Sequence, residues 1–110
     1  MKPTTFETHN DTKVDIDGTH LQGHIDTTFG ALVCTFGEPT VGDEYKTDWE
    51  WEIEFADGTV ATVYNWKNGP NYSRQYHERG LRADQITEWH VGGHKGEALA
   101  LVKQALGGLA

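Results

Sequence analysis

The sequence DWEWEIEF, residues 48–55, alternates acidic and apolar residues without a break, and ADGTVATVYNW, residues 56–66, follows it. Successive side chains of a β-strand point to opposite faces, so this alternation predicts a strand with one apolar and one acidic face. Asp57-Gly58 is a favoured two-residue hairpin loop and predicts an antiparallel return strand over Val60–Trp66. The fold is therefore expected to be organised around this hairpin.

A two-residue loop also fixes which residues of the two strands lie opposite each other. It pairs Phe55 with Val60 and Trp49 with Trp66, and it places Tyr64 on the same face. Each such aromatic side chain buries about 150–250 Å², so this face is predicted to form the core and to pack against helices. The acidic face is either solvated or covered by another strand or subunit.

The segment after residue 28 carries a helical pattern. Apolar residues recur at i, i+3, i+4 and i+7 from Phe29 to Phe36, with candidate N-caps at residues 26–28 and Gly37 placed to end the helix. Cys34, the only cysteine, lies in this helix and is interpreted as a small packed hydrophobic residue rather than a reactive thiol.

The other segments complete the order β-β-α-β-β-β-α. They are strands at 13–16 and 19–25 around an Asp17-Gly18 turn, a loop at 38–47, a long connection at 67–85, a strand at 86–91 and a helix at 95–106. This order predicts an α+β fold, an antiparallel sheet of about five strands with two helices packed on it. Residues 1–12 lack hydrophobic periodicity and are predicted to be a flexible N-terminal tail, which leaves residues 13–110 as the single domain.

Length and composition limit the class of protein. The chain has 110 residues, 36% of them hydrophobic and 24% charged, which suits one compact domain. No apolar run approaches the length of a membrane span, and one cysteine cannot form an internal disulfide. These features predict a cytoplasmic protein without a membrane partner.

The net charge of −8 is unevenly distributed. Residues 1–60 hold thirteen acidic and three basic residues, whereas residues 61–110 hold four acidic and six basic residues. An acidic protein repels nucleic acid over long range, which argues against non-specific nucleic-acid binding. The basic second half can still attract a small anion.

Residues suited to catalysis or metal binding form no recognised motif. His20 and His24 are four residues apart, as are His90 and His94, but that spacing brings ligands together on a helix and these residues lie on predicted strands. They are interpreted as surface or capping histidines. Ser73 is the only serine and lacks the context of a nucleophile. The sequence therefore predicts a binding protein with no catalytic residues, no metal and no cofactor.

An aromatic and basic segment begins at the end of the return strand. Stacking aromatics, guanidinium groups and an amide are the groups that bind the base and the phosphates of a nucleotide, and a helix N-terminus favours an anion. The candidate ligand-binding residues are Asn65, Trp66, Lys67, Tyr72, Arg74, Arg79 and Arg82, together with His94 and Lys95 before the last helix. The alternative is that the aromatics belong to the core and the arginines are merely solvated.

Four segments resemble a family of small proteins of tailed bacteriophages and prophages. They are THLQG at 19–23, FGEP at 36–39, DGTVATVYNWK at 57–67 and TEWHVGG at 87–93. This resemblance spans about residues 19–100 and implies a protein that counters host defence by binding, in the host cytoplasm. The aromatic and basic segment then favours a homo-oligomeric sponge that encloses a small phosphorylated nucleotide immune signal.

A second hypothesis assigns the function to the acidic half of the chain. The acidic side chains would mimic phosphate groups and occupy the basic groove of a host defence protein, such as a CRISPR effector. They are Glu50, Glu52 and Glu54 of the predicted strand, together with Asp43 and Glu44. Under this hypothesis the arginines of the 67–85 connection are dispensable, whereas under the first they are essential.

Overall fold

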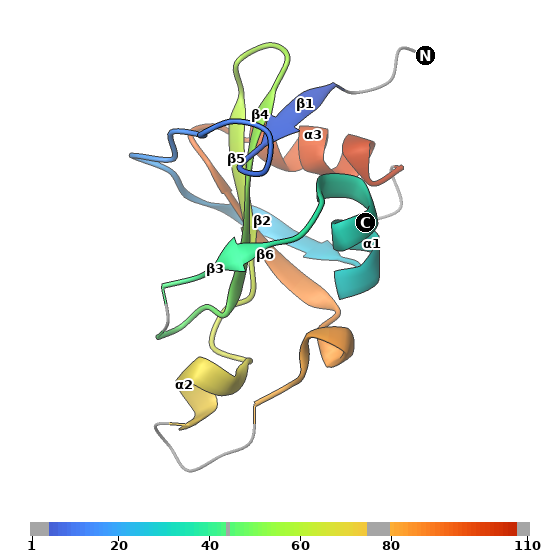
Figure 1. Cartoon of the computed structure of the whole chain (residues 1–110). Coiled ribbons are helices and arrows are strands. Elements are labelled where there is room, and N and C mark those ends of the chain that lie inside the picture. The colour runs from blue at the N-terminus through green and yellow to red at the C-terminus, as the bar shows by residue number, and fades with distance from the viewer. Residues whose placement is uncertain (1–4, 44, 75–79, 108–110) are drawn as a thin grey trace.

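The computed structural model describes residues 5–43, 45–74 and 80–107, and it has the expected α+β fold with an antiparallel sheet (Figure 1). The strands are β1 (Phe6–Thr8), β2 (His20–Asp26), β3 (Thr40–Val41), β4 (Trp49–Phe55), β5 (Val60–Tyr64) and β6 (Glu88–Gly93). The helices are α1 (Phe29–Phe36), α2 (Pro70–Arg74) and α3 (Glu97–Ala105), with a 3₁₀ turn at Ala83–Gln85. The strand order is β1-β4-β5-β6-β2, and β3 pairs with the start of β4.

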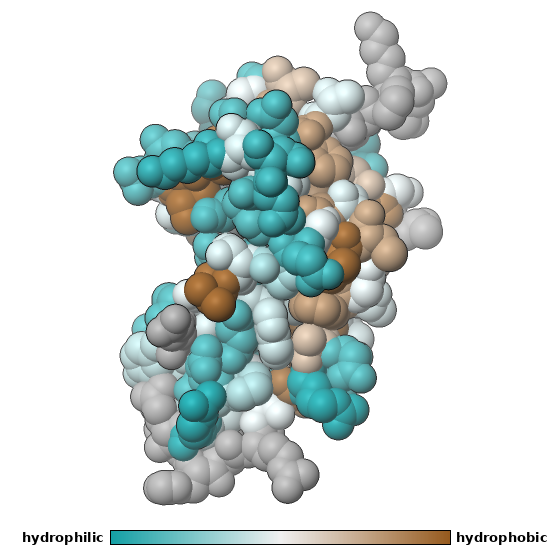
Figure 2. Space-filling model, viewed as in Figure 1, coloured by the Kyte–Doolittle hydropathy of each residue, from teal (hydrophilic) through white to brown (hydrophobic). Residues whose placement is uncertain are grey.

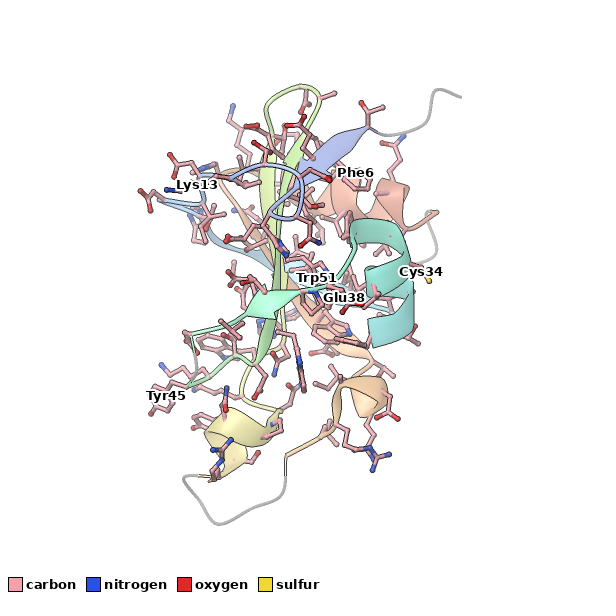
Figure 3. The ribbon with its side chains drawn as sticks, viewed as in Figure 1. Phe6, Lys13, Cys34, Glu38, Tyr45 and Trp51 are labelled. Atoms are coloured by element: carbon pink, nitrogen blue, oxygen red, sulfur yellow. The ribbon has the colours of Figure 1, made fainter. Side chains whose placement is uncertain are left out.

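The core lies between the sheet and the helices α1 and α3. Trp51 and Trp89 are fully buried with their rings edge to face at 5.5 Å, and Phe29 of α1 packs 5.7 Å from Trp51. Figure 3 shows Trp51 between the sheet and α1, where its indole N–H donates a hydrogen bond of 2.7 Å to the carbonyl of Gly37. The apolar face of β4 is therefore the core face, as the alternation predicts.

The register of the β4–β5 hairpin differs from the predicted one by one residue. The loop has three residues, not two, because the N–H of Phe55 donates to the carbonyl of Thr59 at 2.8 Å and Gly58 takes a φ of +90°. Type I turns closed by a left-handed glycine form such three-residue loops. Trp51 consequently pairs with Val63 and not with Tyr64.

This one-residue difference moves every side chain of β5 to the other face of the sheet. Ala61 and Val63 are buried in the core, whereas Thr62 and Tyr64 share the opposite face with the glutamates of β4. The prediction that Tyr64 and Trp66 extend the apolar face is therefore wrong. Trp66 remains 38% exposed.

Part of the predicted N-terminal tail is a strand of the sheet. Phe6–Thr8 forms β1, with Phe6 opposite Phe55. The ring of Phe6 lies 5.1 Å from that of Phe36 and 6.0 Å from that of Phe55. Three residues are too few to show a period in the sequence, so only the partner strand reveals this element.

The predicted hairpin around Asp17-Gly18 does not form, because residues 13–16 are not a strand. Gly18 makes a turn with a φ of +80°, and β2 pairs instead with β6, which follows it by more than sixty residues. The pairing of β2 with β6 contains a bulge between Leu21 and Gly23.

Helix α1 begins and ends as its sequence predicts. The hydroxyl of Thr28 accepts a hydrogen bond of 3.1 Å from the N–H of Ala31, and Gly37 ends the helix with a φ of +88°. Cys34, however, is exposed on the side of α1 away from the sheet (Figure 3), which corrects its interpretation as a packed residue. None of the helices in the described ranges is long and apolar enough to cross a membrane.

If β1 is an integral part of the fold, Phe6→Ala will lower the free energy of unfolding by about 2 kcal/mol, because it removes a partly buried ring from the core. Urea denaturation followed by tryptophan fluorescence measures this change. Thr5→Ala, an exposed neighbour, is the control and should change stability by less than about 0.5 kcal/mol. Equal stabilities for the two variants would show that the segment is dispensable.

Candidate functional site

The sheet face opposite α1 and α3, called the outer face below, contains a small pocket of about 200 Å³. Glu50, Thr62 and Tyr64 line it from β4 and β5, and Trp66 lies at the end of β5. Gly92 of β6 also lines it, and a Cβ at Gly92 would lie 2.5 Å from the hydroxyl of Thr62. The pocket therefore depends on the missing side chain of Gly92 and on the register that turns Tyr64 outward.

Glu50 gives this pocket an unusual acid–base character. Burial, and to a smaller extent the nearby carboxylates of Glu52 and Asp43, raise the pKa of Glu50 from 4.5 to about 7. Burial, and then the charge of Glu50, also raises the pKa of Tyr64. Near neutral pH the carboxyl of Glu50 can thus donate or accept a hydrogen bond with a bound molecule.

Beside the pocket, two lysines and three aromatic residues form what we call the lysine–aromatic cluster: Tyr45, Lys46, Trp66, Lys67 and Tyr72. The ammonium groups of Lys46 and Lys67 lie 5.4 and 5.7 Å from the centre of the Trp66 ring. Lys67 is also 5.5 Å from the ring of Tyr72, which stacks on Tyr45 at 5.9 Å. Figure 3 shows Tyr45 close to α2. Cations within about 6 Å of a ring face are attracted to it, so this cluster concentrates positive charge on a flat aromatic surface.

The backbone holds the two lysines together. The N–H of Lys67 donates a hydrogen bond of 2.8 Å to the carbonyl of Lys46, and Lys67 has a left-handed φ of +59°. Non-glycine residues seldom adopt this conformation, which costs energy unless surrounding contacts fix it. The position of Lys67 is therefore imposed by the fold.

Asn65 is a structural residue, which corrects its predicted role in contacting a ligand. It is fully buried, and its amide oxygen accepts hydrogen bonds from the N–H groups of Asp48 at 2.8 Å and Trp49 at 3.1 Å. Its amide nitrogen donates to the carboxylate of Asp48 at 2.9 Å and to Asn68 at 3.1 Å. Since the whole amide is engaged inside the protein, Asn65 has no group left to bind a base.

The remaining predicted residues do not all lie together. Arg74 ends α2, the helix that contains Tyr72, and is exposed. Arg82 is exposed beside the 3₁₀ turn and forms a 3.2 Å ion pair with Asp84. Arg79 lies outside the described residues.

His94 and Lys95 also lie apart from the cluster. They line a separate surface hollow with Asp57–Val60, at the β4–β5 loop and the opposite end of the sheet from α2 (Figure 1). Of the predicted set, the structure therefore brings together Trp66, Lys67 and Tyr72, and it leaves these two residues in another place.

Lys46, Glu50 and Tyr64 were not among the predicted ligand-binding residues, and Glu50 was named only under the phosphate-mimic hypothesis. The alternation in β4 marks Glu50 as outward-facing, but only the register shows that Tyr64 lies opposite it. Comparisons with protein-family models, curated proteins and solved structures give no match.

Glu50→Gln should raise the free energy of unfolding at pH 8 by on the order of 1 kcal/mol. This value is smaller than the full pKa shift implies, because solvent screens the partly exposed carboxyl group. The folded state binds the Glu50 proton more tightly than the unfolded state does. The free energy of unfolding of the wild type therefore falls as the pH rises from about 4.5 to about 7. Glutamine cannot ionise, so the two proteins should differ at pH 8 and converge at about pH 4, below the pKa of the unfolded state. A stability difference that is the same at both pH values in urea denaturation would contradict this environment for Glu50.

Proposed function

We propose that this chain is a non-catalytic binding protein for a small phosphorylated nucleotide, held between the outer-face pocket and the lysine–aromatic cluster. The observation that carries the proposal is the pair of ammonium groups at 5.4 and 5.7 Å from Trp66, a residue that also lines the pocket. A ring system and two cations at one place are the groups that a nucleotide requires.

The charges of the site define how such a ligand would lie. The pocket contains the carboxyl groups of Glu50 and Asp43, which repel a phosphate but accept hydrogen bonds from the N–H groups of a base. The ammonium groups of Lys46 and Lys67 lie on the Trp66 side. The base would therefore enter the pocket against Trp66 while the phosphates remain with the lysines.

A second copy of the chain would complete the site. The pocket volume of about 200 Å³ is below the roughly 300–1,000 Å³ of sites that enclose a whole ligand. A nucleotide held by one copy would thus remain partly in solvent, and a homo-oligomer would cover it. Together with the resemblance to phage proteins, this supports a sponge that sequesters a nucleotide immune signal of the host.

Trp66→Ala and the double variant Lys46→Gln with Lys67→Gln should each weaken nucleotide binding at least tenfold, because the first removes the stacking surface and the second the phosphate charge. Wild-type protein is incubated with a panel of cyclic dinucleotides, cyclic trinucleotides and ADP-ribose derivatives. The free nucleotides are measured before and after the protein is heated to release its ligand. Calorimetry with the depleted nucleotide then compares the variants.

The control is Arg82→Gln, which removes a basic residue that is ion-paired beside the 3₁₀ turn and should bind like the wild type. If every nucleotide of the panel is fully recovered before heating, the proposal fails. Equal weakening in Arg82→Gln would show that binding depends on overall charge and not on this site.

A second candidate function rests on the acidic end of the outer face. Glu7 of β1 lies directly opposite Glu54 of β4, and within the described ranges neither carboxylate forms an ion pair. Like charges placed opposite each other destabilise a sheet. Figure 2 shows that hydrophilic residues cover much of the surface on this side of the molecule. Such a surface would suit the basic groove of a host defence protein, as the phosphate-mimic hypothesis requires.

Under this second hypothesis Glu7→Lys combined with Glu54→Gln should abolish binding to a purified CRISPR effector complex and raise stability by about 0.5 kcal/mol, because it removes the repulsion across β1 and β4. Biolayer interferometry at increasing salt, with denaturation of the free protein, measures both effects. Trp66→Ala is the matched control and should bind normally. Loss of effector binding in the control, with retention in the charge variant, would reject the acidic interface.

A further inference from the structure

The pairing of β2 with β6 brings two histidines and a glutamate together on the outer face. His24 lies directly opposite His90 in the register, and Glu88 precedes His90 by two residues on the same strand. Side chains two residues apart on a strand share a face, so all three point to the same side of the sheet. One ligand atom of each residue lies within 4.8 Å of the other two.

We propose that His24, Glu88 and His90 form a binding site for a divalent transition-metal ion, with Zn²⁺ as the best match. Imidazole nitrogens and a carboxylate oxygen are the ligands that Zn²⁺ prefers. Two histidines and one glutamate leave at least one coordination position for water or another ligand, as in zinc sites that are open to exchange.

The geometry requires only a small contraction. Zinc bonds of about 2.0–2.1 Å place tetrahedral ligand atoms about 3.4 Å apart. In the structure the three ligand atoms all lie within 4.8 Å of one another. His24 and Glu88 are exposed, so their side chains are free to rotate. A rotation that moves the ligand atoms by about an ångström brings them to zinc-binding distance without moving the sheet. The rings of His24 and His90 are 4.5 Å apart and nearly perpendicular.

The ligand atoms are available for a metal. Among the described residues, no hydrogen bond or ion pair engages the side chains of His24, Glu88 or His90. A bound ion would therefore not have to displace an existing hydrogen bond or ion pair of these three side chains.

Aromatic packing limits the movement of one ligand. The ring of His90 stacks on Trp66 at 6.0 Å and contacts Tyr64 at 5.6 Å. A ligand held in place by its neighbours loses less freedom when the metal binds. Trp66 and Tyr64 also belong to the proposed nucleotide site, but a titration with Zn²⁺ in the absence of nucleotide tests the metal site separately.

Calorimetric titration of EDTA-treated wild-type protein with Zn²⁺ tests the site, and the visible absorption of bound Co²⁺ reports the ligands. We expect one ion per chain with a Kd in the micromolar range or below. His24→Ala, His90→Gln and Glu88→Gln should each weaken binding at least tenfold. Since His24 and Glu88 are exposed, their variants will fold even if the change at His90 disturbs the sheet.

Two control variants distinguish specific binding by these three ligands from a general affinity of the protein for cations. His20→Ala removes a histidine of β2 that lies opposite Gly93, outside the ligand set, and should bind Zn²⁺ like the wild type. Asp26→Asn removes one negative charge directly opposite Glu88 and should change the Kd by less than about threefold. Equal losses in Asp26→Asn and Glu88→Gln, equal losses in His20→Ala and His24→Ala, or unchanged binding in all variants would each overturn the proposal.

Discussion

The backbone register between β4 and β5 decides which side chains enter the core and which face outward. Three backbone groups fix it, at Phe55, Gly58 and Thr59, where the left-handed glycine closes a three-residue loop. A shift of one residue would exchange the two faces of β5. Val63 would leave the core, and Tyr64 would no longer lie beside Glu50, so the same few atoms determine both the packing and the outer-face pocket.

The local sequence was sufficient to predict those elements whose caps or hydrophobic pattern lie within the element itself. Thr28 and Gly37 mark the ends of α1, and the alternation in β4 identifies Trp51 as a core residue. The elements that the sequence did not predict are stabilised by partners far along the chain. β1 is stabilised by the packing of Phe6 against Phe36 and Phe55. A pattern of three residues cannot predict contacts with such distant parts of the chain.

The same distinction holds for the candidate sites. Composition alone selected Trp66, Lys67 and Tyr72, because aromatic and basic residues are dense in that segment, and the structure places these three residues together. It misplaced Asn65, whose hydrogen bonds to Asp48 and Asn68 are visible only in three dimensions. The histidine pairs show the limit most clearly. The sequence spacing suggests His20 with His24 and His90 with His94, whereas the sheet unites one histidine from each pair.

The bulge between Leu21 and Gly23 makes the backbone of β2 irregular and so affects the pairing of this strand with other chains. β2 is the outermost strand on one side of the sheet, and the opposite side ends in the short strands β1 and β3. An outermost strand with a regular, unpaired backbone can form hydrogen bonds with strands of other chains, and this edge-to-edge pairing leads to fibrils. The irregular β2 and the shortness of β1 and β3 oppose such growth at both sides. The sheet therefore disfavours the addition of further strands at either of its two sides.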